Sequence, residues 1–485
     1  MNKMLTKLIG NKVLLYVSTR YAVYAMQFVL LIVIASQLGP YNYGIWGFCL
    51  MLLGYMRYLN FGIANSIDVL LVQSKNDESE SRDYVASAIA SVGILACIIV
   101  VICIIYTLFK IPLFEKYHIG KLFYILCLIS LLFHINNVFG NIYRVYNRLL
   151  ELSLFQSMVP ICLLITVAIF YNNDHLLYFL VGAYLVSHII SFGIFILRGG
   201  IPWRGRASIE KIRILLRKGF YLFLYNSCFY LILTTTSNIV SYYYTVEEYG
   251  YYTFSYSLGH SVLSLLQAFT YVIFPKVIDK FYSSDLDSIK DVLNSLRINY
   301  VSLSHGLMYI AFAVFPLFIL FFPKYQDGLY ALYITALAIL LSTNSFGYNT
   351  LLIAQNKEKI TAIISAVALC INVIVGISLS YIGVPFYCVI FCVMTSYLVF
   401  ALLCAIKARK LLGMKSTISD IVISICPLSL FVPYCVAIII AILHLNYFSW
   451  MPFTLFVVMN KQTIIKIYET LKRIIFNPNI IDVKR

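Results

Sequence analysis

Long apolar stretches alternate with short polar ones along almost the whole chain. Most apolar stretches have about 20 residues or more, the length that an α-helix needs to cross a hydrocarbon layer of about 30 Å. A segment of this kind satisfies its backbone groups within itself only as a helix. We therefore expect an all-α polytopic membrane protein with about 14 transmembrane helices. The predicted spans lie near residues 13–38, 43–72, 85–109, 122–143, 152–171, 176–197, 219–244, 249–275, 298–322, 328–353, 360–382, 384–406 and 420–443, with a weaker one near 446–467.

The basic residues predict the orientation independently of hydropathy. With the N-terminus inside, 30 of the 36 Lys and Arg fall in cytoplasmic segments, and only four fall in outer loops. This bias predicts an even number of spans with both termini in the cytoplasm. The net charge of +16 then reflects topology and attraction to anionic lipids. We expect no nucleic-acid partner.

Two similar halves are indicated by a basic linker and by a repeated turn. The turn that ends with Tyr43-Gly44 recurs as Tyr249-Gly250, again between a first and a second span. Paired six-helix bundles with the substrate site between them are a known transporter plan. The predicted segments are an N-terminal six-helix bundle (1–197), a basic cytoplasmic linker with a short interfacial helix (198–218), a C-terminal six-helix bundle (219–406), and two additional helices with a basic cytoplasmic tail (407–485).

Two arginines lie inside the first two predicted spans, at matching depth. Arg20 shares a helical stripe with Tyr24 and Gln27, and Arg57 shares one with Asp68. An arginine at a helix centre costs about 2.5–3.5 kcal/mol, so the pair costs roughly 5–7 kcal/mol. Either both line a wet cavity and bind an anion, or both extend to the cytoplasmic interface. We take the first as the hypothesis and place Arg20, Tyr24, Gln27 and Arg57 at a substrate site.

Further ionisable residues within or beside the apolar spans are candidates for function. Arg297 begins the ninth span at the cytoplasmic rim and is a further substrate-binding candidate. Asp68, His134 and His305 are candidates for ion coupling, because intramembrane ionisable groups mark proton and ion pathways. The alternative for the histidines is hydrogen bonding between helices.

No catalytic signature is present in the sequence. The chain contains no GxxxxGK[ST], HExxH or GxSxG motif and no paired-cysteine signature. The longest predicted outer loop, from Lys110 to Lys121, is too short for the catalytic groups of a glycosyl polymerase or ligase. We expect a transporter, not an enzyme, with no metal and no cofactor.

The sequence resembles the Wzx-type O-antigen and capsule flippases of the multidrug/oligosaccharidyl-lipid/polysaccharide exporter superfamily. The resemblance rests on the basic N-terminus, Arg20, the turn at 38–44, the span with Gly62, the echo at Tyr249-Gly250 and the proline in Phe274-Pro275-Lys276. It implies a protein of the bacterial inner membrane that moves an undecaprenyl-diphosphate-linked oligosaccharide from the cytoplasmic to the periplasmic leaflet. It also implies alternating access driven by a H⁺ or Na⁺ gradient, with a polysaccharide polymerase and a chain-length regulator as protein partners.

Such a substrate fits the intramembrane arginines, since a guanidinium offers planar donors suited to phosphate. Arg20 and Arg57 would hold the diphosphate, with Asp68 tuning them or sensing the coupling ion. Three alternatives stay open: a lipid II flippase, an ion-coupled exporter of another amphiphile, and a non-catalytic scaffold of a glycan assembly complex.

Overall fold

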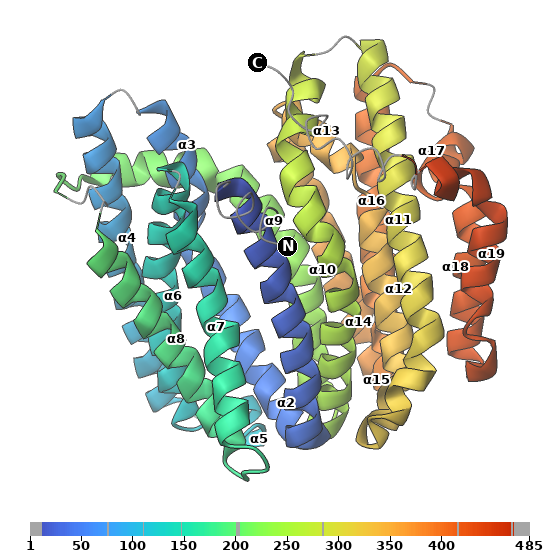
Figure 1. The fold of residues 1–485 in the computed structure, drawn as a ribbon, viewed down its shortest axis with the longest axis horizontal. Coiled ribbons are helices and arrows are strands. Elements are labelled where there is room, and N and C mark those ends of the chain that lie inside the picture. The colour runs from blue at the N-terminus through green and yellow to red at the C-terminus, as the bar shows by residue number, and fades with distance from the viewer. Residues whose placement is uncertain are drawn as a thin grey trace, which may run out of the picture. The chain divides into compact units, whose positions relative to one another are not determined.

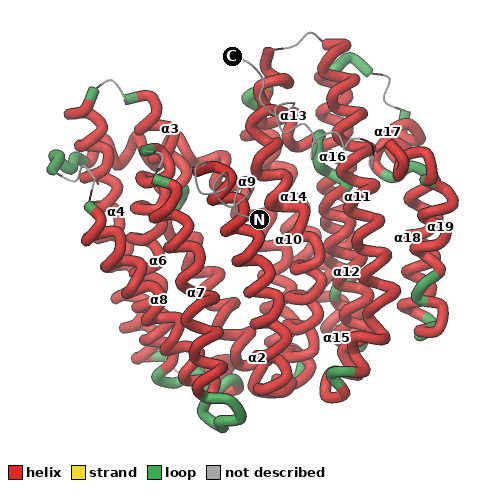
Figure 2. The backbone as a smooth tube through the Cα atoms, in the orientation of Figure 1, coloured by secondary structure: helices red, strands yellow, loops and turns green. Residues whose placement is uncertain are grey.

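The computed structural model describes residues 12–74, 77–109, 111–146, 148–199, 204–283, 286–414, 417–466 and 469. Within these ranges the chain is helical and contains no strand, as Figure 2 shows. Nine helices in the described part are long and apolar enough to cross a membrane, or ten if one bent pair forms a single span. The prediction of an all-α polytopic membrane protein is confirmed, and the count of 14 spans stays a prediction.

The helices are labelled in Figure 1. Their bounds are α2 (Lys12–Arg57), α3 (Ile63–Gln73), α4 (Glu78–Leu108), α5 (Pro112–Lys116), α6 (Leu122–Val145), α7 (Leu149–Ile169), α8 (Leu176–Arg198), α9 (Ile209–Tyr243), α10 (Val246–Ser283), α11 (Leu286–Leu320), α12 (Leu329–Thr343), α13 (Tyr348–Ala354), α14 (Glu358–Ile382), α15 (Phe386–Val389), α16 (Phe391–Leu411), α17 (Ile418–Ile425), α18 (Leu428–Ile442) and α19 (Met451–Met459), with 3₁₀ turns at Tyr58–Asn60, Pro323–Gly328 and Asn446–Phe448.

Packing divides the chain into two compact units, and the division falls between Phe254 and Ser255, inside α10. In the first unit α9 packs against α2, α3 and α4. The sequence places residues 219–244, which form most of α9, in the C-terminal bundle. The four-segment division of the chain stays a prediction.

The first hairpin is tighter than the sequence indicates. Gly39 alone leaves the helical conformation (φ 67°, ψ 171°), and the helix resumes at Pro40. Glycine tolerates this backbone conformation, and proline fits the first turn of a helix because its missing N–H would have no partner there. The predicted turn at 38–44 is therefore one residue long, and both arms belong to α2.

Two predicted spans are interrupted where glycine adopts a positive φ. The second predicted span breaks at Tyr58–Gly62, where Gly62 has φ 88°. The tenth breaks at 344–347, where Gly347 has φ 87°. Both were expected to be continuous, and hydropathy missed the breaks because they lie within apolar sequence.

Two further segments differ from the sequence in where their helices begin and end. The thirteenth predicted span, 420–443, consists of two helices, α17 and α18, that meet at 71° before Pro427, and the pair can still form one span. The linker helix is not a separate interfacial element, because α9 runs without a break from Ile209 to Tyr243. Asp83 of α4 holds the start of this segment: its carboxylate accepts from the Arg206 backbone N–H and from Lys211 Nζ, each at 2.7 Å.

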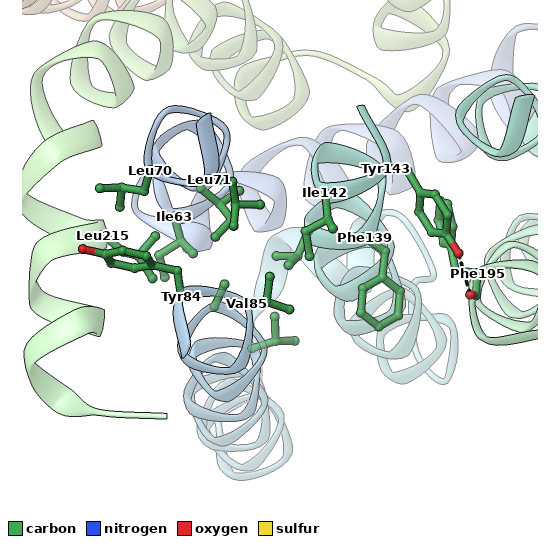
Figure 3. Close-up of a cluster of buried hydrophobic side chains, with 14 residues drawn as sticks. Ile63, Leu70, Leu71, Tyr84, Val85, Phe139, Ile142, Tyr143, Phe195 and Leu215 are labelled. Carbon is green, nitrogen blue, oxygen red and sulfur yellow. Dashed lines mark hydrogen bonds between the residues drawn. The ribbon is translucent and has the colours of Figure 1, made fainter. Parts of the chain in front are cut away.

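One apolar cluster fastens five helices of the first unit together. Figure 3 shows the side chains of this cluster, which come from α3, α4, α6, α8 and α9. The Tyr143 hydroxyl donates to the Phe195 carbonyl at 2.9 Å and so satisfies its polar group. Close packing of this kind is the main attraction between helices in lipid. It gives the nearby interrupted span a rigid support.

Candidate functional site: a cationic cluster beside a helix break

Arg57 is the last residue of α2, directly before the break. The carbonyls released there have partners: His134 Nε2 lies 3.0 Å from the Met56 oxygen, and Asn60 Nδ2 donates to the Arg57 oxygen at 3.2 Å. Gly62 N in turn donates to Asn60 Oδ1 at 2.9 Å. The break is thus an ordered structure, and the negative end of the helix dipole favours a cation at Arg57.

The Arg57 guanidinium is held at one edge by a hydrogen bond and lies near one aromatic ring. Its Nη2 donates to the Tyr184 hydroxyl at 3.0 Å, and its carbon lies 4.9 Å from the centre of the Phe133 ring. The residue as a whole is exposed. Among the described residues no carboxylate lies within ion-pair distance of it. Arg57 therefore keeps a positive charge and donors for a ligand.

The surroundings of Arg57 place it deep in the membrane-crossing part of the unit. Phe133 and His134 lie at the middle of α6, which has 24 residues, and Tyr184 and His188 lie near the middle of α8, which has 23. A positive charge at that depth costs about 2.5–3.5 kcal/mol. A role in binding an anion would explain why the protein tolerates this cost.

Two polar side chains between α6 and α8 are incompletely bonded. His188 is 3% exposed, and neither of its ring nitrogens has a hydrogen-bond partner. Asn136 donates through Nδ2 to the His188 carbonyl at 2.8 Å, while its Oδ1 is unpartnered. An unsatisfied buried polar group costs about 1–3 kcal/mol. His188 and Asn136 thus lie, incompletely bonded, in the middle parts of α8 and α6.

Arg20 has a separate, simpler environment. Its guanidinium carbon lies 5.4 Å from the centre of the Tyr24 ring, one helical turn away, and Gln27 is exposed. No contact in the described part of the chain joins these three residues to Arg57. They stay candidates for substrate binding.

Asp68 lies on α3, after the break, and pairs with Arg144 of α6. One of its oxygens, Oδ1, is buried without a hydrogen-bond partner. The structure thus gives Asp68 a different cation from the one that the sequence analysis assigned to it.

Arg297 and His305 both bind Asn344 in the second unit, where the tenth predicted span breaks after α12. Arg297 donates to the carbonyls of Asn344 (2.9 Å), Phe346 (2.7 Å) and Ser424 (2.9 Å). Both ring nitrogens of His305 have partners, the Tyr309 hydroxyl at 3.0 Å and Asn344 Oδ1 at 3.1 Å. Arg297 also lines a cavity of about 320 Å³. Its three hydrogen bonds go to backbone carbonyls, two at the break after α12 and one in the last turn of α17.

The sequence analysis missed Phe133, Tyr184 and His188, which complete the surroundings of Arg57. One signal for two of them was available: Tyr184 and His188 lie at i and i+4 on one face of a mainly apolar span.

The long apolar helices, the interrupted spans and the unpaired intramembrane cation together define a multi-pass membrane transporter. The chain belongs to the polysaccharide biosynthesis protein family, which it matches over residues 9–279. The family resemblance expected from the sequence is confirmed.

Known relatives and solved structures agree with this class. An Escherichia coli (strain K12) protein described as "Putative O-antigen transporter" is 23% identical over 347 residues, which are 69% of this chain and 81% of that protein. The lipid II flippase MurJ in an inward closed conformation has a TM-score of 0.68 at 13% identity, over 95% of this chain and all of that one. An inward-facing multidrug resistance MATE family transporter of the MOP superfamily has a TM-score of 0.64 at 12% identity, over 82% and 98%. The two structures show the fold, and none of the three proteins is named as an enzyme, in agreement with the prediction.

Proposed function

We propose that this chain is a flippase that moves an undecaprenyl-diphosphate-linked oligosaccharide from the cytoplasmic to the periplasmic leaflet of a bacterial inner membrane. Alternating access coupled to an ion gradient would drive the movement, with both termini in the cytoplasm. The observation that carries the proposal is Arg57: an exposed arginine near the middle of the spanning helices, without a carboxylate partner among the described residues.

The chemistry of Arg57 suits a diphosphate. A charged headgroup cannot enter hydrocarbon without compensation, and an arginine supplies both charge and directed donors. Tyr184 and Phe133 hold one edge and one face of the guanidinium, which limits its rotation. A fixed guanidinium loses less entropy when a ligand binds.

The relatives support the same substrate class. The family is described by polysaccharide biosynthesis, one relative is described as an O-antigen transporter, and one structure of similar fold is a lipid II flippase. All three descriptions involve glycans or glycan-bearing lipids.

Gene deletion with complementation tests the proposal. Deletion should abolish the surface polysaccharide and cause undecaprenyl-linked units to accumulate on the cytoplasmic side. Arg57→Ala should lower the rate of polysaccharide export about 10- to 100-fold, since hydrogen bonds to a charged group contribute about 1.5–3 kcal/mol. Arg57→Lys should keep part of the rate, because the charge remains while the planar donors are lost.

Arg82→Ala is the matched control. Arg82 pairs with Glu78 one turn away at the exposed start of α4, so its loss should leave export unchanged. Normal export by Arg57→Ala at normal expression would reject the proposal. Altered drug resistance with intact glycan would indicate an exporter of another amphiphile. Loss of peptidoglycan synthesis would indicate a lipid II flippase, and a parallel loss of several assembly steps would indicate a scaffold.

A further inference from the structure

His188 differs from His134 and His305, the two intramembrane histidines that the sequence singled out. It is buried at the middle of α8, and both ring nitrogens lack a hydrogen-bond partner. His305, equally buried, has a partner for each nitrogen. A histidine with free nitrogens can accept a proton without breaking an existing bond.

His188 shares its neighbours with Arg57. The Tyr184 ring lies 5.5 Å from the imidazole, and the Tyr184 hydroxyl accepts from Arg57. The centre of the Phe133 ring lies 5.9 Å from the centre of the His188 imidazole, and the same ring lies under the Arg57 guanidinium. Arg57 and His188 are therefore joined through two aromatic side chains.

The titratable groups around His188 come from three helices. α2 contributes Arg57 and α6 contributes His134, whose ring packs against Phe133 as that of His188 does. α8 itself contributes Tyr184. From α7, the centre of the Phe155 ring lies 6.4 Å from the centre of the His188 imidazole. Arg57 is thus the charged neighbour that can change the protonation of His188.

His134 is the weaker candidate for a mobile proton. Its Nε2 lies 3.0 Å from the Met56 oxygen, and because a carbonyl only accepts, this nitrogen carries the hydrogen. Its Nδ1 has no partner, and a cavity of about 10 Å³, room for about one water molecule, adjoins the residue. His134 therefore supports the helix break, whereas His188 has no comparable structural bond.

We propose that His188 takes up one proton when an anionic diphosphate headgroup binds at Arg57, and releases it when the headgroup leaves. The inference rests on the proposed function. In the empty site the charge of Arg57 disfavours a second cation nearby in a medium of low dielectric constant. A headgroup with a negative charge on each phosphate reverses that balance.

The charges of the loaded site then cancel. The proton moves from water to the bare ring nitrogen, which gives an imidazolium with two N–H donors. One charge from Arg57 and one from His188 match the two charges of the diphosphate. A cluster with no net charge has a lower desolvation free energy in a low-dielectric medium than a charged cluster. The inference thus names His188 as the site of the proton that neutralises the loaded cluster.

The affinity for the diphosphate headgroup should therefore rise as the pH falls. The rise should occur at pH values at which His188 is protonated in the loaded site and neutral in the empty one. The test uses the full chain in detergent micelles and geranylgeranyl diphosphate as the probe. Calorimetry in two buffers with different heats of ionisation gives the number of protons taken up, and titrations from pH 6 to 8.5 give the affinity. The wild type should gain up to about tenfold in affinity per pH unit relative to His188→Phe.

His175→Phe is the matched control, because His175 is exposed directly before α8. It should keep the wild-type proton uptake, while His188→Phe and His188→Asn lose it and still bind the probe at pH 8.5. Titration of the probe itself contributes equally to every variant. Equal uptake in the wild type and the His188 variants would overturn the inference, and so would a wild type that takes up no more than titration of the probe explains. Undiminished binding by Arg57→Ala would instead reject the proposed function.

Discussion

Gly44 of α2 and Gly250 of α10 lie against each other, so the two segments that echo one another in the sequence meet in the first unit. A Cβ on Gly44 would lie 3.2 Å from Gly250 N, and a Cβ on Gly250 would lie 3.2 Å from Gly44 N. The same atoms would overlap the carbonyl oxygens of Val246 and Pro40, respectively. Small residues at such positions let helix backbones approach closely in lipid. The repeat thus marks a backbone contact.

Alanine at either glycine should destabilise the protein. The added methyl group would meet backbone atoms of the other helix, and backbone cannot rotate away as a side chain can. We therefore expect Gly44→Ala and Gly250→Ala each to lower the free energy of unfolding by about 1–3 kcal/mol. Titration of the purified protein with sodium dodecyl sulfate, followed by circular dichroism, measures this. Gly93→Ala and Gly182→Ala are controls with no atom within 4 Å of the new Cβ and should change it by less than about 0.5 kcal/mol. Similar values at all four positions would contradict the close contact.

Arg297→Lys should reduce stability more than ligand binding. A lysine ammonium cannot reach three separate carbonyls in the geometry of a guanidinium, and it loses the close stacking of Arg297 on Tyr348 (3.8 Å). We expect a loss of about 2–3 kcal/mol in the same titration, with the affinity for geranylgeranyl diphosphate unchanged in the folded fraction. Lys290→Ala, on the same helix and paired only with the exposed Asp287 among the described contacts, should change neither. If the affinity falls tenfold while stability holds, Arg297 binds substrate as the sequence analysis proposed.

The pair Asp68–Arg144 should survive exchange of its charges. Asp68→Asn or Arg144→Gln alone leaves a partly buried charge without its partner, and we expect each to cost about 1–2 kcal/mol. Asp68→Arg combined with Arg144→Asp should recover at least half of that loss and support export. Complementation of the deletion strain measures export. A double variant that is stable but inactive would show that Asp68 itself senses the coupling ion.

The sequence located the intramembrane cation and left its surroundings open. Arg57 stands out locally because a charge inside an apolar stretch has an obvious energetic cost. Phe133 and Tyr184 do not, since an aromatic residue in a membrane helix is ordinary. Their role follows from contacts between residues that are 76 and 127 positions away from Arg57 in the chain. For the same reason the pairing of Asp68 with Arg144 was missed.

The sequence by itself determined the class of protein and the position of its unusual charges, and it predicted the orientation. Hydropathy and the distribution of Lys and Arg act segment by segment, so they can be read without knowing which helices touch. The tertiary structure alone decided where the spans break, which carbonyls Arg297 satisfies and that His188 lies beside Arg57. Those features depend on glycines with positive φ and on side chains brought together from separate helices, and neither leaves a periodic signal along the chain.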